Sequence, residues 1–90
     1  MNNKVFIVTR LYISASDYNS NGYYDCEVFL DKEKALQLFK KWRKEELDIR
    51  RETECTYEIY TDTEEKFHCS WDIDLEMLII KMQEKTIISD

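Results

Sequence analysis

The side chains best suited to chemistry in this chain are one histidine, three cysteines and several neighbouring carboxylates. His68 and Cys69 are adjacent, which would suit a thiol–imidazole dyad if the two side chains met. The surrounding segment alternates apolar and polar residues as a strand does, and adjacent side chains of a strand point to opposite faces. His68 therefore cannot activate Cys69, and we expect a protein that is not an enzyme and has no catalytic residues.

The sequence contains no other catalytic or cofactor motif. The three cysteines have no CxxC spacing, and a lone histidine supplies no structural zinc pattern. A chain with one glycine has neither a GxxxxGK[ST] phosphate loop nor a GxGxxG dinucleotide loop. We therefore expect no cofactor, and we expect cysteines that pack as small apolar residues.

A loop of turn-forming residues, 15–22, carries part of a calcium-binding pattern. Oxygen-bearing side chains stand on alternate positions, with a glycine at the sharp turn: Asp17, Asn19, Asn21, Gly22 and Asp25. Val28, however, occupies the position at which a calcium loop places its bidentate glutamate. The dipeptide Asn21-Gly22 is also a strong hairpin signal. We expect a plain hairpin loop, with a calcium- or small-ligand-binding site as the alternative.

Residues 27–42, EVFLDKEKALQLFKKW, organise the rest of the predicted fold. Strand alternation gives way at Asp31, a good N-cap, to helical spacing that continues to about residue 51. The stripe of this helix that faces the core comprises Ala35, Leu38, Phe39, Trp42 and Ile49. Glu46 falls near the middle of that stripe. We expect the helix to have left the sheet by Glu46; the alternative is a partnered or functional carboxylate.

Five other segments have the alternation or the composition of strands. They are residues 4–14, 23–30, 55–61, 66–73 and 75–88, and the first of them is expected to be central in the sheet and covered on both faces. The last also fits a helix capped by Asp74, although its β-branched residues favour the strand. The chain is thus expected to form one α+β domain, residues 1–90, of order ββαβββ, with an antiparallel sheet and one long helix on one face.

A single helix covers only one face of such a sheet. We expect a largely aromatic set of side chains on the other face: Phe6, Val8, Tyr12, Tyr23 and Phe29. An apolar surface of this kind is larger than a monomer normally exposes. A homodimer or a partner protein would cover it, and a folded-back C-terminal segment is the alternative.

The charge of the chain is negative and unevenly distributed. A formal net charge of −6 opposes general binding to nucleic acid, whose phosphates repel an acidic protein. The acidic residues gather in the second half of the chain: Asp62, Glu64, Glu65, Asp72, Asp74 and Glu76. The predicted helix has a basic face: Lys34, Lys40, Lys41 and Lys44. Such surfaces are candidate binding sites for a partner of opposite charge.

Length and composition indicate a small soluble protein. Ninety residues, 43% of them hydrophobic, are enough for one modest core. Three cysteines without partner spacing favour a reducing compartment. The N-terminal apolar run is too short for a secretory signal before Arg10 interrupts it, and no run reaches the length of a membrane span. We expect a cytoplasmic protein without membrane association.

Residues 27–39, EVFLDKEKALQLF, resemble the strand-to-helix signature of short uncharacterised bacterial and phage α+β proteins. In those proteins a VF-x-[DS]-KEKA run links a β-hairpin to a helix, and further strands follow. The resemblance implies the α+β layout and a bacterial or mobile-element setting, and it assigns no functional residues. Small acidic phage proteins also include inhibitors of bacterial defence, some of which imitate nucleic acid.

The favoured functional hypothesis is a protein-interaction module, such as a phage or mobile-element inhibitor of a host protein. It would bind through the acidic residues or through the aromatic sheet face. Nucleic-acid binding through the basic helix face is the second hypothesis, and calcium or small-ligand binding is the third.

Overall fold

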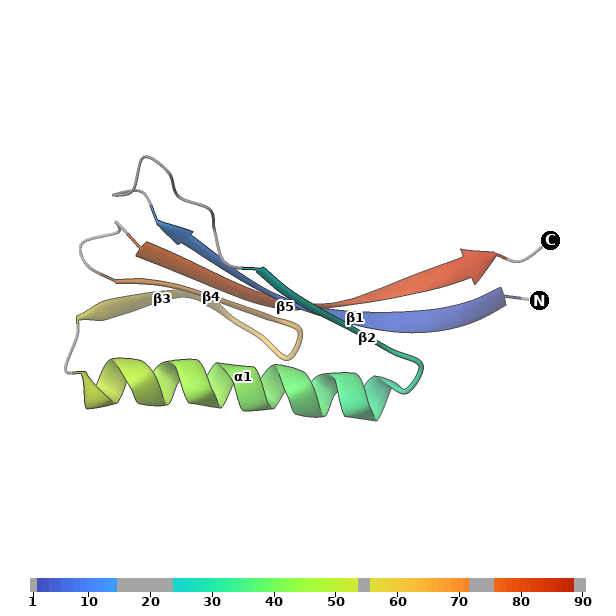
Figure 1. Cartoon of the computed structure of the whole chain (residues 1–90), viewed down its shortest axis with the longest axis horizontal. Helices are drawn as coiled ribbons and strands as arrows, with labels where there is room; N and C mark the ends of the chain where they lie inside the picture. The colour runs from blue at the N-terminus through green and yellow to red at the C-terminus, as the bar shows by residue number, and fades with distance from the viewer. Residues whose placement is uncertain (1, 15–23, 54–55, 72–75, 89–90) are drawn as a thin grey trace.

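The computed structural model describes residues 2–14, 24–53, 56–71 and 76–88. In chain order, it contains β1 (Asn2–Ser14), β2 (Tyr24–Phe29), α1 (Lys32–Glu52), β3 (Tyr57–Asp62), β4 (Lys66–Trp71) and β5 (Glu76–Ile88). The predicted order ββαβββ is confirmed, and so is the choice of a strand over a helix for the last segment. The chain is an α+β domain of two layers, with α1 against one face of the sheet (Figure 1).

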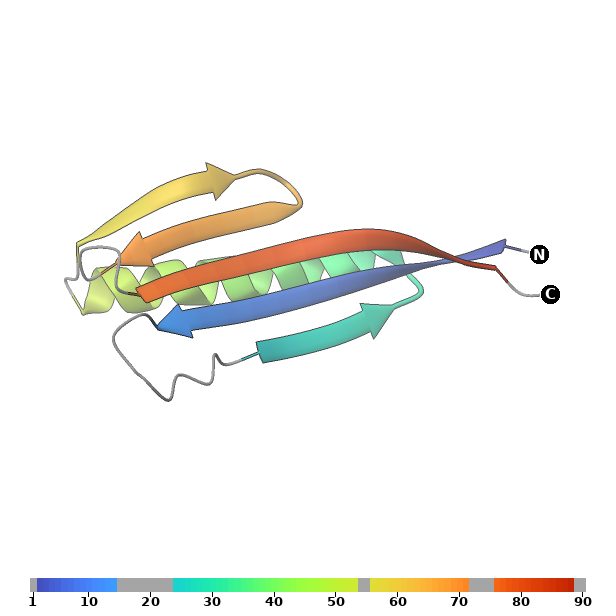
Figure 2. The same cartoon turned by 90° about the horizontal axis from the view of Figure 1, so that it is seen from above.

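The five strands form one antiparallel sheet in the order β2-β1-β5-β4-β3. The two longest strands, β1 and β5, have 13 residues each and pair along their whole length. Their shared ribbon continues past the N-terminal end of α1 (Figures 1 and 2). Figure 2 also shows β2 and β3 at the two outer sides of the sheet. β1 lies between β2 and β5, so it is an interior strand as predicted, although β5 is the middle strand of the five. Among the described residues, α1 covers one face of β1.

Local signals fix both ends of α1. The Asp31 carboxylate accepts a hydrogen bond from the backbone N–H of Glu33 at 2.9 Å, as the predicted N-cap requires. At the other end the Thr53 hydroxyl donates to the carbonyl of Ile49 at 2.8 Å, and this contact replaces a glycine C-cap. None of the helical sequence in the described ranges is long and apolar enough to cross a membrane.

The core lies between α1 and the sheet. Phe39 and Trp42 of α1 pack there with strand residues that alternate toward the helix. These strand residues are Phe6, Val8, Phe67, Cys69, Leu78, Ile80 and Met82, and each is nearly or completely buried. Phe67 and Cys69, alternate residues of β4, are both at 0% exposure.

The prediction of which side of β1 faces away from the helix was wrong. Phe6 and Val8 are buried against α1, and Phe29 packs on the same core. The Tyr12 hydroxyl points to α1, where it donates to Glu46. Tyr23 lies outside the described residues. Both sides of β1 are apolar enough to be buried, so alternation alone does not identify the side that the helix covers.

The prediction that α1 leaves the sheet by Glu46 was also wrong. The Glu46 side chain is 2% exposed, and Arg50, one turn later, is 4% exposed. Ile49, predicted on the buried stripe, is half exposed instead. The last turns of α1 thus lie against the sheet through these charged side chains as well as through Leu47, which is 6% exposed, and the buried charges require partners.

Candidate functional site

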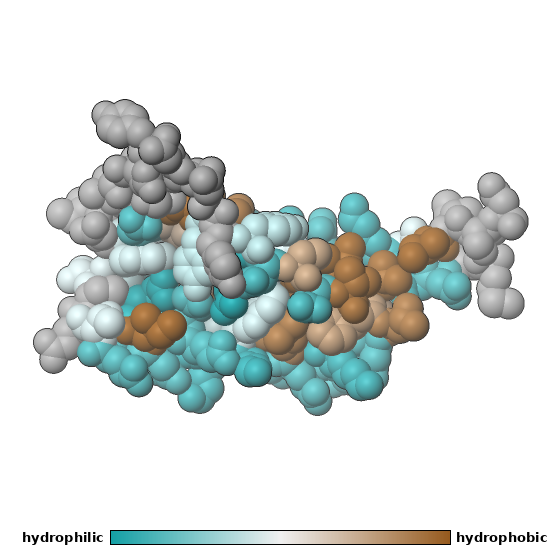
Figure 3. Space-filling view, viewed as in Figure 1, coloured by the Kyte–Doolittle hydropathy of each residue, from teal (hydrophilic) through white to brown (hydrophobic). Residues whose placement is uncertain are grey.

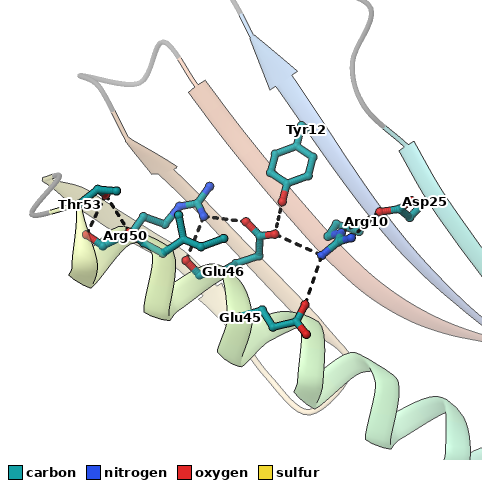
Figure 4. Close-up of polar contacts among 8 residues, drawn as sticks. Arg10, Tyr12, Asp25, Glu45, Glu46, Arg50 and Thr53 are labelled. Carbon is teal, nitrogen blue, oxygen red and sulfur yellow. Dashed lines mark hydrogen bonds and ion pairs between the residues drawn. The ribbon is translucent and has the colours of Figure 1, made fainter.

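A cluster of charged side chains lies between the second half of α1 and the sheet (Figure 4). At its centre, Oε1 of Glu46 accepts a hydrogen bond from Nη1 of Arg50 at 2.7 Å. The other oxygen, Oε2, accepts from the Tyr12 hydroxyl and from Nη1 of Arg10 at 3.3 Å. We refer to Arg10, Tyr12, Asp25, Glu46 and Arg50 as the buried charge cluster. Both carboxylate oxygens at its centre are occupied by donors.

Arg10 connects three elements of the fold. Its Nε and Nη2 both donate to Oδ2 of Asp25, at 2.9 and 2.6 Å, and these two residues face each other in the β1–β2 ladder. Its guanidinium carbon lies 4.6 Å from the centre of the Trp42 ring, a cation–π distance. Arg10 therefore links β2, through β1, to α1.

Arg50 sits deeper, between α1 and β4. Its guanidinium carbon is 3.7 Å from the centre of the Trp71 ring, and Nη1 also donates to the backbone carbonyl of Glu46 at 3.0 Å. Its Nε is buried without a hydrogen-bond partner among the described residues. The ring contact and Glu46 together compensate a charge that would otherwise be costly to bury.

The electrostatics of the cluster favour a fixed protonation state. Burial raises the pKa of Tyr12, and its hydrogen bond to Glu46 raises it further. Burial by itself lowers the pKa of Arg10, but the hydrogen bond to Asp25 and the nearby negative charge outweigh it, so the pKa is raised. The tyrosine thus stays a donor and the arginine stays charged. Such an arrangement suits structural positioning better than proton transfer, which needs a group with a pKa near the working pH.

His68 lies on the face of the sheet opposite the helix. Its ring centre is 5.2 Å from that of Tyr60, and its Nε2 is buried without a hydrogen-bond partner among the described residues. Cys69 belongs to the core on the helix side. The imidazole and the thiol therefore point to opposite faces, as their adjacency on a strand predicted.

The predicted acidic residues that the structure describes do not form one surface. Asp62, Glu64 and Glu65 lie at the turn between β3 and β4, where Asp62 is held by Arg43 with contacts of 2.8 and 2.5 Å. Glu76 begins β5 at the other end of β4, about 17 Å away for a six-residue strand. Asp72 and Asp74 lie outside the described residues. The turn therefore offers only a small acidic group, one member of which is already paired.

The predicted basic face is present on the solvent side of α1. All four lysines are exposed: Lys34, Lys40, Lys41 and Lys44. Lys44 is paired with Asp48 at 2.8 Å, a contact between residues four apart in the helix. A shallow pocket of about 460 Å³ lies between this helix and the β3–β4 turn, with Lys40, Arg43 and Glu64 among its lining residues.

Most of the predicted calcium ligands lie outside the described residues, namely Asp17, Asn19 and Asn21. Asp25 is described, and its Oδ2 is held by Arg10. Within the described ranges, no group of three or more His, Cys, Asp or Glu side chains is placed to hold a metal ion.

The sheet face opposite α1 carries apolar side chains from three adjacent strands. We call this set the open face: Ile7, Leu11, Ile13, Tyr24, Val28, Met77 and Ile79. Leu11 is opposite both Tyr24 and Ile79, so one apolar row crosses all three strands. Ile7 is opposite Val28 on β2 but Gln83 on β5, and Thr9 and Lys81 lie between the two rows. Tyr24 and Val28 are each 59% exposed, and Leu30, just after β2, is 81% exposed. Figure 3 shows hydrophobic side chains gathered over β2 and the neighbouring ribbon.

Sequence reasoning gave a partnered Glu46 only as the alternative, and it missed the other members of the buried charge cluster and the exposed residues of β2. One signal for the cluster was present, because Glu46 and Arg50 have the four-residue spacing of a helical ion pair. Arg10, a lone charge within an apolar strand, was a second signal. For the open face, the signal was the odd-numbered side of β1, which is uniformly apolar apart from Thr9 and Asn3.

Comparisons with known proteins identified no relative of this chain. The chain matches no protein-family model, no curated protein and no solved structure.

Proposed function

We propose that this protein is a protein-interaction module that binds a partner protein through the open face and the adjoining strand β2. The exposure of Tyr24, Val28 and Leu30 is the observation that supports this most. Scattered single apolar side chains are normal on a surface, but Tyr24, Leu11 and Ile79 stand side by side across β2, β1 and β5, and an apolar row of this kind is typical of a binding site.

The buried charge cluster supports the same proposal by holding the surface in place. Arg10 anchors β2 through Asp25 and is itself fixed against Trp42 and Glu46. A binding surface on strands that are already rigid loses less conformational entropy when the partner docks. The cluster thus acts as a support for the binding surface, and a catalytic role is not needed to explain its burial.

The size, the net charge of −6 and the strand-to-helix signature support an inhibitor encoded by a phage or mobile element. Such a protein acts by occupying a surface of a host protein, which requires a stable scaffold and exposed contact residues but no reactive group. The open face is the surface proposed for that contact, in preference to the divided acidic residues.

The experiment that tests the proposal compares two double variants with the wild-type protein. Tyr24→Ser with Val28→Thr removes apolar contacts from the open face, whereas Lys40→Ser with Lys41→Ser alters the solvent side of α1 as a matched control. Each protein is immobilised and exposed to a lysate of the source organism. Captured proteins are quantified by mass spectrometry, and each candidate partner is then purified and titrated against all three proteins.

A purified partner should bind the wild type and the lysine variant with similar affinity, and the open-face variant roughly tenfold or more weakly. Because the substituted side chains are largely exposed, all three proteins should have similar melting temperatures. The proposal is wrong if every purified partner binds the open-face variant as tightly as the wild type.

Nucleic-acid binding by α1 remains a second candidate because Lys34, Lys40 and Lys41 are exposed together. Phosphate contacts of this kind weaken steeply with salt. Filter binding of single- and double-stranded DNA and RNA at low ionic strength tests it, with the lysine variant as the control. Equal retention of nucleic acid by the wild type and the lysine variant, or none by either, would exclude this function.

A further inference from the structure

The two outer strands of the sheet differ in how well their free edges are protected. β3 has a register shift between Ile59 and Thr61, and an irregularity of this kind twists an edge and interrupts its row of backbone donors and acceptors. β2 pairs with β1 in a continuous register from Leu11↔Tyr24 to Phe6↔Phe29. Its outer edge faces no other described strand. β2 also lacks the proline or lysine residues that often block edge pairing.

The charge along β2 indicates what kind of strand would pair with it. Between Tyr24 and Asp31 the chain carries three acidic residues, Asp25, Glu27 and Asp31, and no lysine or arginine. Asp25 is paired with Arg10, whereas Glu27 is exposed and makes no ion pair among the described residues. A second copy of the chain would bring an equally acidic β2 against this one, at a cost from like charges. A basic strand would be attracted instead.

The faces of β2 add a further requirement. Tyr24 and Val28 point to the open face, while Asp25 and Glu27 point to the helix side of the sheet. A strand added beside β2 places alternate side chains on those same two faces. Apolar residues on one face would meet Tyr24 and Val28, and basic residues on the other would meet Glu27.

We propose that β2 is a strand-addition site for an extended segment of a partner protein in which apolar and basic residues alternate. The segment extends the sheet by backbone hydrogen bonds to the free edge of β2, and its side chains supply the selectivity. This inference rests on the proposed function, because it names the edge and the partner chemistry through which the interaction module binds.

The test uses a synthetic peptide, KVKIKVKIK, labelled with a fluorophore and titrated with the full-length protein. A peptide of the same composition in which the lysines are grouped, KKKKKVIVI, is the control for charge and hydrophobicity alone. Fluorescence anisotropy should show saturable binding of the alternating peptide and roughly tenfold weaker binding of the grouped one. Affinity should fall as salt rises, because part of the attraction is electrostatic.

Backbone methylation separates strand addition from contact by side chains alone. Two further peptides carry N-methyl groups, one at the odd-numbered and the other at the even-numbered residues. Only one edge of an added strand faces β2, so one methylated peptide should lose roughly tenfold or more in affinity and the other should lose much less. If both methylated peptides bind as tightly as the parent, strand addition is wrong. The proposed function is tested separately, by the binding of purified partners to the open-face variant.

Two matched substitutions locate the site on the protein. Glu27→Gln removes an exposed charge from β2, and Glu58→Gln removes one from β3, the opposite outer strand. The first should weaken binding of the alternating peptide several-fold, and the second should leave it unchanged. An equal effect of both substitutions, or no saturable binding of the peptide by the wild type, would overturn the assignment to β2.

Self-association is the remaining outcome. Sedimentation of the wild-type protein should show a monomer at concentrations at which the peptide binds. A dimer that disappears in the variant Val28→Lys would assign the edge of β2 to a second copy of the chain and would overturn the basic partner segment.

Discussion

The carboxylate of Glu46 and the guanidinium of Arg50 lie 2.7 Å apart, one turn apart on α1, and both are almost fully buried. Neither charge can reach water, so each depends on the other and on the groups that surround the pair. Tyr12 and Arg10 reach Glu46 from β1, while the Trp71 ring covers Arg50 from β4. Because hydrogen bonds depend on direction, the cluster determines the rotation and the position of α1 on the sheet.

Replacing Glu46 should therefore be strongly destabilising. The variant Glu46→Ala leaves Arg50 buried without a carboxylate, and the expected loss is about 3–5 kcal/mol of unfolding free energy. Urea denaturation measures it. Glu45→Ala is the matched control, because its side chain is 48% exposed and lies 3.9 Å from Arg10; it should cost less than about 1 kcal/mol. Similar losses for the two variants would show that the cluster does not hold the helix.

Removing the whole central network should cost much less than breaking it. The triple variant Glu46→Leu, Arg50→Met, Tyr12→Phe removes the two most deeply buried charges together with the hydroxyl, and apolar groups of similar size fill the space. Arg10 loses Glu46 but keeps Asp25. Replacements of this kind are often neutral or stabilising. The triple variant should therefore recover most of the stability lost in Glu46→Ala. A triple variant less stable than Glu46→Ala would mean that the interactions of the buried charges add more to the free energy of unfolding than their burial subtracts.

The order of elements and the start of α1 were predictable because their signals are local. Asp31 caps the helix through a backbone group two residues away, and strand alternation is readable within a single segment. The face of β1 covered by α1 was not predictable, because Val8 and Ile7 are equally apolar. Tertiary contacts decide between the two sides, because Arg10 and Tyr12 lie on the same side as Val8 and form hydrogen bonds with Glu46 of α1.

The candidate binding site was predictable in kind but not in its residues. The sequence indicated a sheet face left uncovered by a single helix, and the structure assigns that face to Tyr24 and Val28 rather than to Phe6 and Val8. The strand order places β2 at one outer side of the sheet, and that order depends on pairings between residues far apart in the chain. Patterns within one segment carry no information on such pairings.

The hydrogen bond from Tyr12 to Glu46 should make stability depend on alkaline pH. The pKa of Tyr12 is raised in the folded protein, so its contribution is complete below about pH 10, the ordinary tyrosine pKa, and is lost as the pH rises through the folded value. Tyr12→Phe should cost about 1–3 kcal/mol at pH 7. The gap between the two proteins should narrow above pH 10, as measured by urea denaturation at each pH. A gap that widens would contradict the assigned role of the hydroxyl.

The two described cysteines should differ sharply in reactivity. Cys26 is exposed on β2, whereas Cys69 is in the core at 0% exposure. In a Cys55→Ser background, a thiol reagent such as Ellman's should therefore modify one thiol at once and the second only when the protein unfolds. Urea should release the second thiol. Cys69→Ser should abolish the slow phase and retain the fast one, while Cys26→Ser should do the reverse.

Rapid modification of both thiols in the native protein would mean that β4 is not packed beneath α1. Slow modification of both would mean that the face of β2 bearing Cys26 is covered in solution, and the open face would then not be available to a partner.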